Sequence, residues 1–499
     1  MLEQILNSAK LLQPETTLAV TFCLLILVDL LSRKKGHGTA VFALLGLIIA
    51  AFFVLQQASI GANSIFSNML AVDSFSIFFK YLILISAFIV VIFSMQFDEL
   101  TKSKRSVGEY YAVLIALSLG LMLMSSATNL LMMYLSLELS SISSYILAGY
   151  TKDSEDSSEA SLKYIIYGAV SSGMMLYGIS ILYGLTGAVD VYGINKALMM
   201  TDVNTVALMI AGILIVVGFG YKISAVPFHF WTPDVYEGAP ITITAFLSVA
   251  SKAVGFAMMI RFFKVAFMNP AVGNLAYGAW ATFRGFDWNL ILAALSVLTM
   301  TVGNLVAVWQ NNLKRLLAYS SIAHAGYMLM GIVVMSNEGI AAIMIYFVVY
   351  LFMNLGAFYI VMLVANKTGS ENIDDYKGLG YRTPLLGVAM TIFLLSLTGI
   401  PPTAGFIGKL YIFAALINAK WFWLAIVGAL NSVVSLYYYV RILRNMFLRD
   451  PEISAQPIQI SAMEIVVLLM LLLPTLLLGL YFGPLVEYAQ ASVTMFGIR

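Results

Sequence analysis

Long apolar stretches separated by short polar segments run along almost the whole chain. Taking roughly 20 residues as one bilayer crossing, we count about 14 such stretches. Their approximate limits are 14–32, 39–57, 74–96, 109–126, 127–149, 163–185, 205–236, 242–263, 288–310, 315–335, 339–364, 384–418, 422–446 and 460–485. The connecting segments are too short to fold as separate domains. The pattern therefore predicts an all-α polytopic membrane protein.

Composition narrows the classes of function. Of the 499 residues, 61% are hydrophobic and only 10% are charged, and the net charge is +2. This small charge is spread over separate clusters, so nucleic acid is not an expected partner. Cys23 is the only cysteine, and an iron-sulfur cluster normally requires four thiolates. The three histidines have no metal-ligand spacing, so we expect no metal or cofactor on this chain.

The basic residues of alternate loops predict an orientation, because cytoplasmic loops carry the excess of lysine and arginine. One set of loops holds about 16 basic residues and the other about seven. The first set comprises Arg33, Lys34, Lys35, Lys102, Lys104, Arg105, Lys152, Lys163, Lys314, Arg315, Lys367, Lys377, Arg382, Arg441, Arg444 and Arg449, and the second comprises Lys10, Lys196, Arg261, Lys264, Arg284, Lys420 and Arg499. With an even number of spans, both termini are predicted on the non-cytoplasmic side of a bacterial inner membrane.

A few charged residues lie inside the predicted spans. The remaining basic residues are Lys80, Lys222, Lys252 and Lys409, and Glu138 joins them in "MMYLSLELSSISSY". A charge near the bilayer centre costs about 2.5 to 3.5 kcal/mol even on the lenient insertion scale. Such residues are retained where they are paired, hydrated or functional.

Proline and glycine interrupt two of the spans beside these lysines. In "GYKISAVPFHFWTPDVYEGAP", Pro227 disrupts the helix that contains Lys222. In "SLTGIPPTAGFIGKLYIF", Gly399 and the prolines after it interrupt the twelfth span shortly before Lys409. Unwound backbone at membrane depth needs protein or water to satisfy its polar groups. Each break therefore predicts a hydrated cavity beside a lysine.

An internal similarity links the two halves. Segments starting at Tyr164 and Tyr346 share tyrosine, threonine and glycine in register, ending in Thr186-Gly187 and Thr368-Gly369. The same shift superposes spans 4–8 on spans 9–13, and a repeated unit of five spans must be inverted in the membrane. We expect residues 1–108 to form helices 1–3, 109–266 and 267–447 to form two inverted five-helix repeats with one broken helix each, and 448–499 to form helix 14.

Several segments carry a family resemblance over nearly all of the chain. They are "SLKYIIYGAVSSGMMLYGISILYG", "VPFHFWTPDVYEGAP", "SVASKAVGFA", "NLKRLLAYSSIAHAGYMLMG" and "LTGIPPTAGFIGKL". Together they resemble the antiporter-like subunit N of the proton-pumping NADH:quinone oxidoreductase, respiratory complex I. "WTPDVYEGAP" and "LAYSSIAHAGY" separate subunit N from subunits L and M and from multi-subunit sodium/proton antiporters.

The resemblance implies a fold, partners and site residues. The family has 14 transmembrane helices with two inverted five-helix units, and its FMN, iron-sulfur clusters and quinone are expected on partner subunits. Other membrane-arm subunits, including the neighbouring antiporter-like subunit, and the lipid bilayer are the expected partners. By resemblance the relay residues are Glu138, which pairs with Lys222, and Lys252, Lys409, Lys163 and His229.

Proton transfer also follows from the chemistry of these groups. A lysine in a medium of low dielectric binds its proton less tightly than one in water, and a nearby carboxylate has the opposite effect. A proton held by Lys222 beside Glu138 could therefore pass toward Lys252 when the pair separates. Hydroxyl groups of "SSISSY" could carry the water chain between them.

Each residue also has a structural interpretation. Glu138 and Lys222 could form a packing ion pair, and Lys163 could be a flanking anchor. Lys80 is favoured to reach the membrane interface by snorkelling. His229 and His324 could be relay groups or satisfied core residues. Asp234 and Glu237 are favoured to orient the second half of the broken helix.

Functions of different classes remain open at this point. The leading one is a proton-translocating subunit of an oxidoreductase, a translocase with no redox chemistry on this chain. The alternative is a cation/proton antiporter subunit of a multi-subunit Na⁺/H⁺ antiporter, and a weaker one is a structural membrane anchor. The spans contain lysines where hard cations need oxygen ligands, which favours the first.

Overall fold

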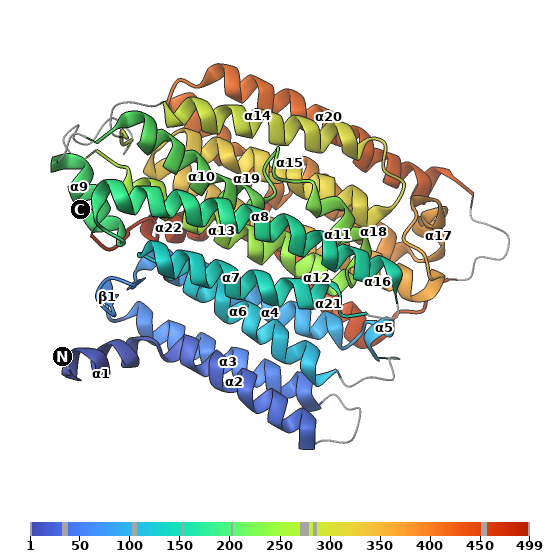
Figure 1. The fold of residues 1–499 in the computed structure, drawn as a ribbon. Coiled ribbons are helices and arrows are strands. Elements are labelled where there is room, and N and C mark those ends of the chain that lie inside the picture. Colours follow the sequence, from blue (N-terminus) through green and yellow to red (C-terminus); the bar gives the residue numbers. More distant parts are fainter. Residues whose placement is uncertain are drawn as a thin grey trace.

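The computed structural model arranges the apolar stretches as long helices that run side by side (Figure 1). It describes residues 2–31, 38–101, 107–151, 154–200, 203–269, 279–282, 287–450 and 457–497. Within these ranges, 13 helices are long and apolar enough to cross a membrane. Two shorter apolar helices, α18 (Pro384–Thr398) and α19 (Ala404–Asn418), form the interrupted twelfth span. The observed helices agree with the predicted count of about 14.

Five helices and a short hairpin form the N-terminal part of the bundle. The antiparallel hairpin pairs Asn63 with Val72. The elements are α1 (Leu2–Leu11), α2 (Gln13–Leu31), α3 (Gly38–Ala58), β1 (Asn63–Ile65), β2 (Leu70–Val72), α4 (Ser74–Ser94) and α5 (Asp98–Thr101). Figure 1 shows α2 and α3 along one edge of the bundle, and both expose much of their apolar surface.

The middle of the chain supplies two groups of helices. The first comprises α6 (Gly108–Ser126), α7 (Leu130–Ala148), α8 (Glu155–Thr186), α9 (Val191–Met200), α10 (Thr205–Ile223), α11 (Trp231–Gly238), α12 (Ile241–Phe246) and α13 (Lys252–Arg261), with π-helical segments at Leu247–Ser251 and Phe262–Ala266. The second comprises α14 (Trp288–Ala307), α15 (Leu313–Val333), α16 (Asn337–Thr368), a 3₁₀ turn (Ile373–Tyr376), α17 (Leu379–Arg382), α18, α19 and α20 (Phe422–Leu448). The chain continues with α21 (Ala462–Leu480) and α22 (Gly483–Ala491).

The core lies around the eighth span, Ile241–Ala266, which is completely buried. Helices α15 and α16 are also almost wholly buried, whereas only about a third or less of the residues of α2, α20 and α21 are buried. A bundle in water would hide those apolar faces, so the outer helices are built to face lipid or protein. Charged residues inside the central helices are consequently far from the surface of the chain.

Helices α8 and α16 have matching ends. Each is 32 residues long, begins after a serine cap and ends at a glycine in the left-handed region, with φ of 67° at Gly187 and 70° at Gly369. The loops before α7 and α15 also match: Leu130 donates to the Val189 carbonyl, and Leu313 donates to the Glu371 carbonyl, both at 2.8 Å.

The two long helices run in opposite directions. The start of α8, at Ser154 and Asp156, borders the same cavity as Ala365 and Gly369 near the end of α16. At the opposite end of the bundle, Lys264 donates to Asn337 at the start of α16 at 2.8 Å.

Two of the basic residues assigned to loops lie inside a span. Arg261 and Lys264 were expected in a loop, but both lie in the eighth span, which continues to Ala266, and they are 0% and 4% exposed. The predicted span, 242–263, ended three residues too early and already contained Arg261, which the count of loop charges nevertheless included. Other basic residues used in the count lie outside the described residues, namely Arg33, Lys34, Lys35, Lys102, Lys104, Arg105, Lys152, Arg284 and Arg499.

Candidate functional site

The seventh span is interrupted between α10 and α11, as the prolines predicted. Ser224 adopts a left-handed conformation with φ of 62° and ends α10, and α11 begins only at Trp231. The freed backbone is satisfied by protein: Ala225 donates to the Gly220 carbonyl, and Val226 donates to the Thr299 hydroxyl at 3.0 Å. The break is therefore a defined turn at membrane depth.

Lys222 lies in the last turn of α10 and faces α7. It is 2% exposed, and its Nζ donates to the Ser140 hydroxyl at 2.8 Å and reaches the Ser141 hydroxyl at 3.5 Å. Glu138, half-buried on the same helix α7, interacts electrostatically with Lys222. No ion pair within 4 Å joins these two described residues, so serine hydroxyls are the direct partners of the ammonium group.

Gly255 brings the first two lysines together. A methyl group at this position of α13 would lie 3.2 Å from Cγ of Lys222 and 2.8 Å from Cγ2 of Ile223. The stem of Lys222 therefore packs directly on α13, one turn beyond Lys252. Only glycine allows this close approach.

Gly255→Ala should lower proton pumping without removing any titratable group. The added methyl overpacks the contact, at a cost of about 1–3 kcal/mol, and pushes Lys222 away from Lys252. Pumping by sealed vesicles, normalised to the amount of assembled complex, measures the effect. Gly173→Ala is the matched control, since a methyl there meets nothing within 4 Å. Equal pumping by the two variants would show that this approach is unimportant.

Lys252 begins α13 immediately after the π-helical segment Leu247–Ser251. Its side chain is 1% exposed, and its Nζ donates to the Ser321 hydroxyl of α15 at 2.8 Å. The same nitrogen lies 5.8 Å from the centre of the Tyr236 ring, on the second half of the broken helix. Lys252 therefore contacts a hydroxyl and an aromatic face, a polar but uncharged setting.

Helix α15 presents polar groups at intervals of three residues. Ser321 binds Lys252, and His324 follows one turn later, with its Nδ1 2.7 Å from the Tyr346 hydroxyl and its Nε2 3.3 Å from the Tyr439 hydroxyl. Tyr327 comes one further turn along. Residues three apart are neighbours on a helix surface, so Ser321, His324 and Tyr327 of α15 lead from the contact with Lys252 to the contact with Lys409.

Lys222, Lys252, His324 and Lys409 form a buried row, and Lys409 is its last member, beside the interruption between α18 and α19. Its Nζ donates to the Thr398 carbonyl at 2.7 Å and to the Ser432 hydroxyl at 3.1 Å, and it lies 4.6 Å from the centre of the Tyr327 ring. Gly399 ends α18 with φ of 89°, and a methyl there would lie 2.7 Å from Cδ of Lys409. The turn between α18 and α19 thus requires glycine for its conformation and for its space.

Lys163 belongs to a different cluster, at the half-exposed end of α11. It forms ion pairs with Glu159 at 2.7 Å and with Asp234 at 2.5 Å. Arg315 pairs with the same Asp234 and with Glu237, at 2.7 and 2.6 Å. These contacts tie α11 to α8 and α15, which fits the orienting role considered for the two acidic residues.

His229 lies in the turn between α10 and α11. Its side chain is 6% exposed, and its Nδ1 has no hydrogen-bond partner among the described residues. Its ring packs 4.6 Å from that of Phe230. No hydrogen bond or ion pair joins Lys163 or His229 to Lys222, Lys252 or Lys409 among the described residues, and membership of all six residues in the relay stays a prediction.

The expectation that Lys80 snorkels to the interface is wrong. Lys80 is 1% exposed and forms an ion pair with Glu15 of α2 at 2.6 Å. It also donates to Oε1 of Gln57 at 3.1 Å. Glu15 gives little signal of this role in the sequence, because a carboxylate at the start of an apolar stretch resembles an interface residue.

The described residues contain no group of three or more His, Cys, Asp or Glu side chains that could hold a metal ion. His37 lies outside the described residues. The site is a row of single buried cations, each hydrogen-bonded to a serine hydroxyl, with the His324 imidazole held by two tyrosine hydroxyls.

Comparison with known proteins places the chain in a family. The family model described as "NADH:quinone oxidoreductase/Mrp antiporter, TM" matches residues 127–435. NADH-quinone oxidoreductase subunit N 2 of Chloroherpeton thalassium is 48% identical, with 98% of this chain and 96% of the relative covered. The chain belongs to the family of NADH-quinone oxidoreductase subunit N.

Solved structures agree with the subunit N family. A chain of respiratory complex I from Thermus thermophilus, solved with bound aureothin, is 30% identical with a TM-score of 0.77, and 96% of this chain and 99% of that chain are covered. A chain of the Mrp complex from Dietzia has a TM-score of 0.82 at 20% identity, covering 98% and 97% of the two chains. The second likeness shows the fold alone.

Proposed function

We propose that this chain translocates protons as a membrane-arm subunit of an NADH:quinone oxidoreductase. The observation that carries the proposal is the buried row of Lys222, Lys252, His324 and Lys409, in which each member is hydrogen-bonded to hydroxyl groups and Lys409 also to a carbonyl. Buried charges of this kind are costly in a membrane and mark proton or ion pathways. As a translocase subunit the chain moves protons, while FMN, the iron-sulfur clusters and quinone reside on partner subunits.

Each group in the row has a role in moving a proton. The Lys222 ammonium group is held by Ser140 and influenced by Glu138; when this influence weakens, a proton passes through ordered water toward Nζ of Lys252. Ser321 and His324 both donate and accept hydrogen bonds, so they relay the proton along α15. Lys409 receives it beside the second break and releases it.

The predicted orientation assigns the two ends of the bundle to the two sides of the membrane. The end of the bundle with Lys163 and Arg315 is the predicted cytoplasmic side, and both chain termini are on the other side.

We assign residues 109–266 and 267–447 to two inverted repeats of five helices, between an N-terminal part, 1–108, and helix 14 in 448–499. The matched ends of α8 and α16, their opposite directions and the paired loop contacts support this assignment.

A cation/proton antiporter subunit is the alternative. A sodium site would need several oxygen ligands around the ion, usually with carboxylates among them. The described row instead offers ammonium groups that repel a cation, and Glu138 is the only carboxylate assigned to it. This favours proton transfer between the lysines.

Two tyrosines on α16 give a matched test. Tyr346→Phe removes the hydroxyl that holds Nδ1 of His324, whereas Tyr350→Phe, one turn away, removes a buried hydroxyl with no hydrogen-bond partner among the described residues. The first change should cost about 0.5–1.5 kcal/mol of stability and lower proton pumping markedly. The second should leave pumping near the wild-type rate.

Pumping is measured in sealed membrane vesicles after NADH addition, with the assembled complex quantified in the same preparation. A sodium gradient imposed without NADH distinguishes the antiporter alternative from the proposal, because an antiporter would exchange sodium ions for protons under this gradient. Equal pumping by Tyr346→Phe and Tyr350→Phe would remove His324 from the relay.

A further inference from the structure

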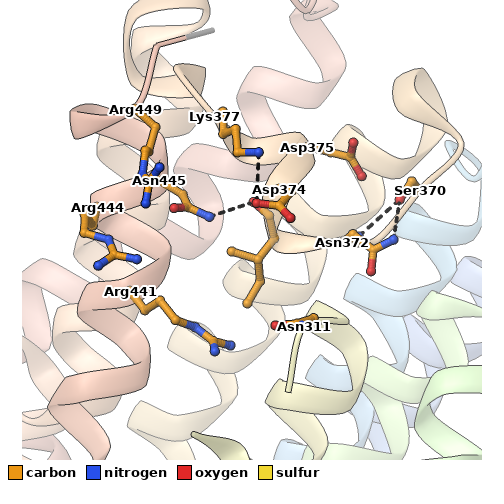
Figure 2. A pocket seen from close by; sticks show the side chains of 11 residues that line it. Asn311, Ser370, Asn372, Asp374, Asp375, Lys377, Arg441, Arg444, Asn445 and Arg449 are labelled. Carbon is orange, nitrogen blue, oxygen red and sulfur yellow. Dashed lines mark hydrogen bonds and ion pairs between the residues drawn. The ribbon is translucent and has the colours of Figure 1, made fainter. Parts of the chain in front are cut away.

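A cavity of about 500 Å³ lies at the end of α20, away from the buried row. It is bordered by Arg441, Arg444 and Arg449 of α20 and its C-cap, by Lys377, and by Asn311 and Asn372 from two neighbouring loops. Figure 2 shows the arginines along one wall and the two asparagines across from them. The cavity belongs to the end of the bundle that carries α17, the predicted cytoplasmic side (Figure 1).

The cavity has more positive charge than its own acidic residues balance. Its lining holds four basic side chains, the three arginines and Lys377, against two carboxylates, Asp374 and Asp375. Lys377 is paired with Asp374 at 3.1 Å. The Arg441 guanidinium donates to the carbonyls of Val308 and Gln310, which fix its position without neutralising it. Arg444 and Arg449 are exposed and have no hydrogen bond or ion pair with the described residues. Arginine is the side chain best suited to phosphate, because its planar fork can donate two parallel hydrogen bonds.

An apolar stripe on α20 leads to these arginines. Leu430, Val433, Tyr437 and Val440 are 62%, 68%, 63% and 43% exposed. Their spacing of three and four residues places them on one helical face, and Arg444 continues the same face four residues after Val440. The exposed surface of α20 thus changes from apolar to cationic within one turn, which matches the change from acyl chain to phosphate along a phospholipid.

We propose that this cavity binds the phosphate headgroup of an anionic phospholipid, with its acyl chains along the Leu430–Val440 stripe. Arg444 and Arg449 contact the phosphate, Arg441 fixes the inner wall, and the asparagines donate to headgroup oxygens. Basic pockets between transmembrane helices on the cytoplasmic side commonly hold such headgroups. A free phosphate ion or an acidic residue of a partner subunit would satisfy the arginines without using the apolar stripe.

The test is the amount of anionic lipid retained by the purified, assembled complex. Native mass spectrometry and lipid extraction compare the wild type with the double variant Arg444→Gln/Arg449→Gln, after delipidation and titration with phosphatidylglycerol. The apparent affinity of this site should fall by about tenfold or more, because each arginine contributes separately near a charged headgroup. Both side chains lack partners among the described residues, so we expect the variant to assemble.

Control experiments distinguish the phospholipid from the other possible occupants of the cavity. Lys367→Gln removes an exposed charge from the last turn of α16 without touching the cavity, and should retain the lipid. Phosphatidylcholine should not replace phosphatidylglycerol, and inorganic phosphate should not displace it. Equal lipid retention by the double variant, displacement by inorganic phosphate, or loss of a partner subunit in place of lipid would each overturn the proposal. These readouts do not depend on proton pumping.

Discussion

Lys252→Met should reduce NADH-driven proton pumping severalfold while leaving the complex assembled. Lys252 is the link between the part of the row on α7 and α10 and the part on α15, through its contact with Ser321. Methionine has a similar length, so packing is nearly preserved, and it carries no charge to be left unpaired in the core. Proton transfer, however, loses its titratable group at the centre of the row.

The measurement needs three quantities from one preparation: proton uptake by sealed vesicles, NADH oxidation and the amount of assembled complex. Lys264→Met provides a matched control on the same span. Lys264 is also buried, but it binds Asn337 and the Val493 carbonyl, outside the row. Its replacement should lower stability and leave pumping per complex unchanged. If Lys252→Met pumped at the wild-type rate per complex, the proposed row would not carry protons.

The sequence predicted most of the fold because membrane helices have a strong local signal. Apolar length defined the spans, and Pro227 and Gly399 marked the two interruptions that the structure contains. The cost of a charge in hydrocarbon was enough to single out Lys222, Lys252 and Lys409 among the basic residues. These features depend on residues close together in the chain, where pattern and physical cost can be evaluated directly.

Long-range contacts could not be predicted in the same way. Ser321 lies 69 residues from Lys252, and serine is common in membrane helices, so nothing in the sequence marks it as the partner. His324 could be named but not placed between Tyr346 and Tyr439. Arg261 was assigned to a loop because the carboxylate that allows its burial, Asp73, is 188 residues away. Pairing decides whether a charge is buried, and pairing is a property of the fold.

Asp73→Asn should destabilise the subunit by about 3–5 kcal/mol, the usual effect of breaking a fully buried ion pair. Asp73 and Arg261 are both inaccessible to solvent, and two hydrogen bonds of 2.7 and 2.9 Å join them. Asparagine cannot neutralise the guanidinium group, which would stay buried with its charge uncompensated. We expect little of this chain in the membrane at growth temperature, and an early thermal transition for any complex that forms.

Two further variants test whether the broken ion pair is the cause of the lost stability. Asp374→Asn breaks the pair with Lys377 at the surface, where Asp374 is 77% exposed, and should cost no more than about 1 kcal/mol. Asp73→Asn/Arg261→Met removes both charges and should recover part of the lost stability. Recovery would be incomplete, because the Asp73 carboxylate also caps α4 through Ser76 and accepts a hydrogen bond from the Phe496 amide. The single carboxylate thus joins the start of α4, the end of α13 and the segment after α22. If Asp73→Asn were as stable as Asp374→Asn, that junction would not hold these three regions together.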